Sequence, residues 1–210
     1  MRSGLSLQPA AENAITPYNP LVVALVLVAA GAALGALFLV REARDAHGPD
    51  DRQSFAWLFG LVGGVALLVS GEIFWANWAG FPASQYTELF GVAQTLYALV
   101  MLSAAFTVYH DIDVRPFAWV TAVAGVLLLQ GARAILSFGL TLSPTVSAAI
   151  WLSAGLGALV LLPAAYADAE STARTALVYL AAALFVVLAA ASLGMGVEAH
   201  YGHIAEAVAN

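Results

Sequence analysis

The sequence predicts an all-α membrane protein: a six-transmembrane-helix bundle with N- and C-termini extracytoplasmic. Two observations predict this fold class. Of the 210 residues, 62% are hydrophobic and only 10% are charged, which is too little charge to cover the surface of a soluble protein. In addition, six apolar runs each reach the length of about 20 residues that a helix needs to cross a hydrocarbon core of about 30 Å. These runs cover residues 20–41, 55–78, 85–109, 117–138, 145–167 and 175–197.

The first two runs carry glycine pairs at helical spacing. Run 20–41 is too long to be the apolar region of a secretory signal, so we expect it to remain as a helix. It contains Gly31 and Gly35, and run 55–78 contains Gly60 and Gly64. Such G-x-x-x-G pairs allow two helices to cross closely. They are compatible with packing inside one bundle or with contact between copies of the chain.

Turn-forming residues separate the later runs and give the domain organisation. Breaks are expected at Gly48-Pro49, Gly80-Phe81-Pro82, Arg115-Pro116 and Ser143-Pro144. We therefore expect a polar N-terminal segment over residues 1–19, one six-helix transmembrane domain over 20–197, and a short C-terminal tail over 198–210. No further domain fits in the chain.

The arginines orient the predicted bundle. Five of them fall in the first, third and fifth loops, on one side: Arg41, Arg44, Arg52, Arg115 and Arg174. Basic residues accumulate on the cytoplasmic side of membrane proteins, so this side is predicted to face inward in the cell membrane. Both termini then face out. Trp57 and Trp119 suit the inner interface, and Trp75 and Trp151 the outer one, because tryptophan favours the membrane–water boundary.

Three charged residues are predicted to share one layer inside the membrane. Counted from the cytoplasmic edge, Glu72 lies about 25 Å and Arg133 about 24 Å along its helix, and Glu88 reaches a similar level. Charged residues at this depth normally face the bundle interior and pair. We therefore expect Arg133 to serve both carboxylates. The cluster would either fix helix register or form a polar vestibule or proton site below the outer surface.

A second polar layer is predicted near the midplane, where Gln94 and Gln130 fall. Gln130, Arg133 and Ser137 follow one another at i, i+3 and i+7, which places them on one stripe of a helix. Two accounts fit these amides: a hydrogen bond between Gln94 and Gln130, or a constriction that offers donors and acceptors to a passing solute.

Composition excludes several kinds of chemistry. The chain has no cysteine and no lysine, so disulfides, thiolate metal sites, cysteine nucleophiles and a retinal Schiff base are excluded. Glu198, His200 and His203 are weak candidates for a Zn or Cu site or a pH sensor at the end of the chain. We expect no cofactor, no bound nucleic acid and no enzymatic activity, because no catalytic motif or basic cluster is visible.

Three stretches resemble a known family. They are ELFGVAQTLYALVML, DIDVRPFAWVTAVAGV and LSFGLTLSP, and they are similar to small archaeal and bacterial membrane proteins defined only as a domain of unknown function. This resemblance covers residues 55–165.

A more distant resemblance is to the amide and urea channels of the AmiS/UreI type, which have six helices and both termini outside. Their third helix has a Leu-Phe-Gly and Leu-Tyr pattern followed by an Arg-Pro turn, and AIWLSAG, residues 149–155, is similar to their fifth helix. The matching positions are Leu89, Phe90, Gly91, Leu96, Tyr97, Arg115 and Pro116. Unlike those channels, the last helix here lacks a membrane-embedded glutamate. The resemblance implies the topology.

Two functions remain open at this point. The first is passage of a small polar solute or a proton through the bundle, with Gln94, Gln130 and Arg133 along the route and Glu72 and Glu88 at the outer mouth. The second is a non-catalytic integral subunit of a larger membrane assembly. The expected partners are the lipid bilayer and either further copies of the chain or other membrane subunits.

Overall fold

The protein is an all-helical bundle. The computed structural model describes residues 20–75, 87–141 and 143–209, and this part of the chain contains no strand. The elements are α1 Pro20–Ala43, α2 Pro49–Trp75, a short π-helix η1 Thr87–Gly91, α4 Val92–His110, α5 Arg115–Phe138, α6 Pro144–Tyr166 and α7 Thr172–Ala209. Six spans are long and apolar enough to cross a membrane, η1 and α4 together forming the third. The predicted fold class is confirmed, and the protein is a multi-pass membrane protein.

Two helix boundaries differ from the predicted ones. Helix α2 begins at Pro49, with Asp50 and Asp51 in its first turn. Proline and acidic residues both favour the start of a helix, which explains the early beginning. Helix α7 continues to Ala209, so the segment predicted as a short tail is helical almost to its end. The predicted polar segment 1–19 and the loop 76–86 lie outside the described residues.

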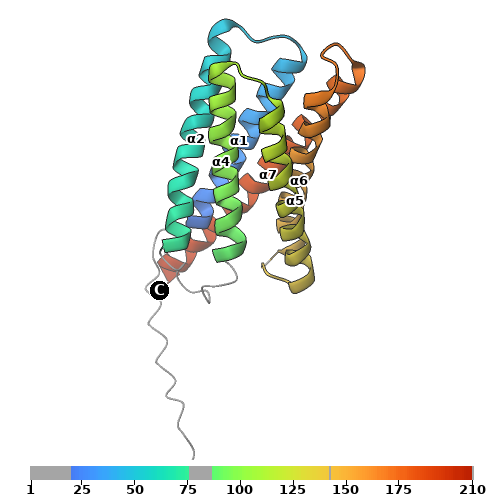
Figure 1. The fold of residues 1–210 in the computed structure, drawn as a ribbon. Helices are drawn as coiled ribbons and strands as arrows, with labels where there is room; N and C mark the ends of the chain where they lie inside the picture. Colours follow the sequence, from blue (N-terminus) through green and yellow to red (C-terminus); the bar gives the residue numbers. More distant parts are fainter. Residues whose placement is uncertain (1–19, 76–86, 142, 210) are drawn as a thin grey trace, which may run out of the picture.

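The helices lie side by side, with both ends of the described chain at the same end of the bundle (Figure 1). The most extensive packing joins α1 to α7, α2 to α4 and α5 to α6, and α6 also packs on α7. We call the end that holds residues 44–48, 111–114 and 167–171 the arginine-rich end. The other end, where α1 begins and α7 ends, is the terminal end. Which of the two faces the cytoplasm stays a prediction.

Glycines set the closest helix approaches. A Cβ atom at Gly125 of α5 would lie 2.8 Å from the carbonyl oxygen of Gly155 in α6, so only glycine fits this crossing. In α2 the close approach is made by Gly63, whose added Cβ would lie 2.9 Å from the backbone nitrogen of Leu102. The predicted partner glycine, Gly64, has no described atom within 4 Å of the same position.

The core centres on α6 and includes Trp151, which is only 8% exposed. Its ring packs against Gly131 of α5 and belongs to a cluster with Ile135, Leu25 and Leu188. Trp151 was predicted to suit the outer membrane interface; its level in the membrane stays a prediction, but its ring lies inside the bundle and not on the outer surface of the helices. The interface rule considers depth alone, whereas the glycine on α5 opens a space that draws the indole into the bundle.

Candidate functional site

A central cavity of about 920 Å³ runs between the helices. Its lining begins at Glu42, Arg52 and Arg174 at the arginine-rich end and reaches Ser147 and Glu198 toward the terminal end. Most of the side chains between these ends are apolar. A cavity of this volume between membrane helices is large compared with a water molecule, whose share of liquid volume is about 30 Å³.

Gln94 is the buried amide on the wall of this cavity. It is 5% exposed, and it is the third residue of α4, which directly follows η1. Its Nε2 is buried and has no hydrogen-bond partner among the described residues. Leaving a buried amide donor unpaired costs about 1–3 kcal/mol. The otherwise mainly apolar wall therefore includes one residue whose buried amide donor has no described partner.

Aromatic side chains line the same cavity as this amide. Phe90 and Trp151 meet edge to face, with ring centroids 6.1 Å apart, and both line the cavity. Tyr97, one helical turn after Gln94, also lines it, and its hydroxyl donates to the Leu27 carbonyl of α1 at 2.6 Å. That hydroxyl fits because residue 31 is glycine, since a Cβ there would collide with it. The wall that a solute would contact therefore includes three aromatic rings.

Gln130, Arg133 and Ser137 do share one stripe of α5, as predicted, but the stripe is exposed on the outside of the bundle. The inward face of α5 is the one that carries small buried residues such as Ala122, Gly125 and Ala132. The predicted hydrogen bond between Gln94 and Gln130 is therefore not formed in the described structure. Gln130 instead lines a second groove together with Glu88, and this groove shares residues such as Leu96 and Trp151 with the wall of the central cavity.

The predicted cluster of Glu72, Glu88 and Arg133 is not brought together. All three side chains are exposed, and no ion pair among the described residues joins Arg133 to either carboxylate. Helix α2 packs on α4 and α1, while α5 packs mainly on α6, so α2 and α5 do not face each other closely. A similar depth along their helices does not bring the three side chains into contact, because they lie on helix faces that point in different directions.

Only two of the three weak metal candidates have side chains that the structure describes. Glu198 is exposed and lines the cavity at the terminal end, and His200 is exposed. The side chain of His203 lies outside the described residues. Among the residues that the structure describes, no three histidine or acidic side chains gather as a metal site would require.

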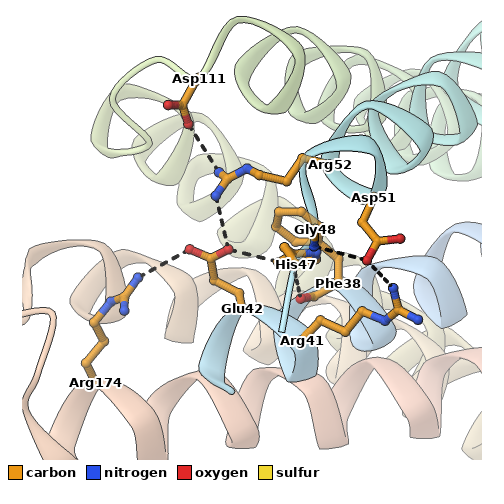
Figure 2. Close-up of polar contacts among 9 residues, drawn as sticks. All are labelled: Phe38, Arg41, Glu42, His47, Gly48, Asp51, Arg52, Asp111 and Arg174. Carbon is orange, nitrogen blue, oxygen red and sulfur yellow. Dashed lines mark hydrogen bonds and ion pairs between the residues drawn. The ribbon is translucent and has the colours of Figure 1, made fainter. Parts of the chain in front are cut away.

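A network of ion pairs at the arginine-rich end was not among the predicted site residues. There the carboxylate of Glu42 forms ion pairs with the guanidinium groups of Arg52 and Arg174, with N···O distances of 3.5 Å and 3.9 Å. Arg52 also reaches Asp111 at 3.4 Å. Figure 2 shows the carboxylate of Glu42 between the two guanidinium groups. Glu42, Arg52 and Arg174 lie on α1, α2 and α7, and Asp111 directly follows α4.

Two local features accompany the acids of this cluster, Asp111 and Glu42. Asp111 follows α4 in the left-handed conformation, with φ of 50°, which aspartate tolerates better than most residues. Beside Glu42, His47 lies at 3.7 Å and donates from Nε2 to the Phe38 carbonyl at 3.2 Å. In the sequence, the only signal was that acids and arginines share these loops, which we used for orientation alone.

The family of the chain follows from one comparison. A family model described as "Protein of unknown function (DUF981)" matches residues 17–206. The chain belongs to this family. The match extends well beyond the residues 55–165 on which the sequence resemblance was based and covers all six spans of this DUF981 protein. No curated protein matches the sequence.

A solved structure has a similar fold. The cryo-EM structure of the Helicobacter pylori urea channel in its closed state matches this DUF981 protein with a TM-score of 0.57 and 20% sequence identity. The match covers 82% of this chain and 97% of the channel chain. The suspected resemblance to AmiS/UreI-type channels is confirmed at the level of the fold.

Proposed function

We propose that this DUF981 protein is a channel of the cell membrane that passes small, uncharged polar solutes of about the size of urea through the central cavity. The observation that carries the proposal is the Gln94 amide, a buried donor on the cavity wall without a partner among the described residues. A solute carbonyl or hydroxyl can accept from this group and relieve the cost of leaving it unpaired.

Two further features support a neutral solute rather than a proton. The lining between the two ends of the cavity is mainly apolar, and proton transfer requires a continuous chain of hydrogen-bonding groups. In addition, the similar solved structure is a urea channel. That likeness concerns the fold, so the solute class rests on the cavity itself. The proposal requires no catalytic step.

The test is solute flux into proteoliposomes, measured by stopped-flow light scattering with urea and with acetamide. The wild-type protein should equilibrate at least one of them faster than empty vesicles. Gln94→Leu removes the donor without adding volume, so flux should fall about tenfold, the factor that corresponds to about 1.4 kcal/mol of lost stabilisation. A rate equal to that of empty vesicles for every small neutral solute would overturn the proposal.

Gln130→Leu is the matched control, because it makes the same change on the outward face of α5. Flux should be unchanged in this variant. If Gln130→Leu lowers flux as much as Gln94→Leu does, the route passes outside the central cavity and Gln94 does not have the proposed role.

A second proposal concerns assembly. Gln130, Arg133 and Ser137 form an exposed polar stripe on a membrane-spanning helix, with Glu88 and Gln130 in one groove. Polar residues facing lipid are costly and normally contact protein or water. We propose that copies of the chain associate through this face of α5, where Arg133 of one copy can meet a carboxylate of the next. A different membrane subunit on the same face is the alternative.

A further inference from the structure

Three charged residues at the arginine-rich end lie where helix electrostatics disfavours them. Glu42 is in the last turn of α1, whereas Arg52 and Arg174 are in the first turns of α2 and α7. The partial charge of a helix is negative at its C-terminal end and positive at its N-terminal end, so each of these residues repels its own helix end. The helix dipole would favour the opposite charges at these positions, so another interaction must offset this cost.

That interaction is the one they make with one another. The Glu42 carboxylate lies 3.5 Å from Arg52 and 3.9 Å from Arg174, and its side chain is only 28% exposed. The Nε of Arg52 is buried without a partner among the described residues. The three side chains come from three different helices and converge on one point (Figure 2). Because each charge is unfavourable for its own helix, the reason for the cluster is to be found in the place where the three side chains meet.

The position is the end of the central cavity. Glu42, Arg52 and Arg174 all line it, and they are its charged lining at the arginine-rich end. Asp113 and Arg115 form an ion pair at 3.7 Å at the same end of the bundle, but neither lines the cavity. The cluster therefore presents one carboxylate and two guanidinium groups to anything that enters or leaves the cavity at this end.

We propose that Glu42, Arg52 and Arg174 form an ion barrier at the mouth of the route, and that Glu42 is the residue that determines charge selectivity. An anion that approaches the mouth meets the carboxylate, and a cation meets two guanidinium groups. At these distances charges interact strongly in a partly buried site. A neutral solute with donors and acceptors exchanges hydrogen bonds with either group and passes. This inference rests on the proposed channel function, because the barrier acts only on a permeating species.

The proposed barrier predicts which ions, anions or cations, each variant should admit. Without Glu42 the cavity lining keeps two positive charges and no negative charge of its own at this mouth. Asp111, outside the lining, still pairs with Arg52, but Arg174 loses its carboxylate partner, so anions should enter. In proteoliposomes, Glu42→Gln should raise chloride flux about tenfold, which corresponds to about 1.4 kcal/mol of barrier. Urea flux, measured on the same preparation, should stay within about twofold of wild type. Asp113→Asn, the matched control outside the cavity, should change neither flux.

Two more variants keep the test decisive if Glu42→Gln does not fold. Arg174→Glu leaves two carboxylates and one guanidinium at the mouth, so it should admit potassium and not chloride. It is expected to fold because an acid is favoured in the first turn of α7. The double variant Glu42→Gln with Arg174→Gln removes one charge of each sign and should return chloride flux toward the wild-type value.

The outcomes separate this inference from the proposed function. Urea flux in the wild type with no chloride flux in Glu42→Gln and no potassium flux in Arg174→Glu overturns the barrier and leaves the channel intact. Absence of urea flux in the wild type overturns the proposed solute. Chloride flux that appears only in Glu42→Gln supports the barrier in either case, and an equal rise in Asp113→Asn overturns it.

Discussion

The inward and outward faces of α5 differ in what they demand of a residue. The inward face meets α6 so closely that small residues such as Gly125 and Gly131 are required. The outward face is open and carries large apolar side chains together with Gln130, Arg133 and Ser137. Two glutamines that lie near the midplane by residue count therefore have opposite surroundings, because Gln94 faces the cavity and Gln130 faces away from it.

The depth of a residue in the membrane and the direction in which its side chain points are therefore separate properties. Depth follows from counting residues along a helix at 1.5 Å each. Direction depends on the rotation of the helix about its axis, which its packing partners set. On α5 the packing partner is α6, and the fit of Trp151 against Gly131 determines the rotation. The polar stripe is left facing outward as a consequence.

The largest expected effect comes from disturbing the inward face. In Gly131→Ala, the added Cβ would collide with the ring of Trp151, which is buried and cannot easily move. Overpacking a core typically costs about 1–3 kcal/mol, so the free energy of unfolding in detergent should fall by about that amount. Differential scanning fluorimetry of the purified protein measures the change through the melting temperature.

Gly64→Ala is the matched control for this substitution. A Cβ at Gly64 would have no described atom within 4 Å, and alanine is favoured over glycine inside a helix by about 1 kcal/mol. Its melting temperature should therefore stay the same or rise. If Gly131→Ala is as stable as Gly64→Ala, the Trp151 ring does not fix the rotation of α5.

A smaller effect is expected on the cavity wall itself. Tyr97→Phe removes the hydrogen bond from the hydroxyl to the Leu27 carbonyl. A single intramolecular hydrogen bond contributes about 1 kcal/mol, so unfolding should become easier by about that amount. Tyr109→Phe is the control on the same helix, since the Tyr109 side chain is exposed and its hydroxyl makes no hydrogen bond to a described residue. Equal stability of the two variants would show that the contact between α1 and α4 does not depend on this bond.

Much of the fold could be predicted from the sequence because the signals are local. Apolar length predicted the six spans, and proline and glycine predicted the breaks between them. The end of α7 was not predicted, because polar residues such as Glu198 and His200 suggest an exit from the membrane without stopping the helix. Leaving the membrane and ending a helix are different events, and the second needs a strong breaker such as proline, which α7 does not contain.

The candidate site was less predictable because it depends on contacts between helices. Gln94 was identified from its polarity at depth, and the structure places it on the cavity wall. Its expected partner Gln130 and the expected pairing of Arg133 depended on helix rotation, which one sequence does not contain. The Glu42 cluster was missed for a related reason. Its members are 10 and 132 residues apart, and each alone reads as an ordinary loop charge.

The smallest expected effect on stability concerns Arg133, the residue that distinguishes the outward face. Because Arg133 is exposed and has no ion pair within the described chain, Arg133→Leu should change the stability of the monomer by no more than about 0.5 kcal/mol. A buried pair inside the bundle would instead cost about 3–5 kcal/mol when broken. The same substitution should weaken assembly, because it removes the cation from the proposed interface.

Size-exclusion chromatography with light scattering in mild detergent tests both halves of this prediction on one sample. Wild type should elute as an oligomer and Arg133→Leu as a smaller species with an unchanged melting temperature. Val123→Leu, an apolar change on the same exposed face about three turns from Arg133 toward the arginine-rich end, should leave the mass unaltered. If Arg133→Leu unfolds easily and Glu72→Leu restores its stability, the pair forms within one chain after all. Arg133 would then point into the bundle, and the distinction between the inward and outward faces of α5 would be wrong for this residue.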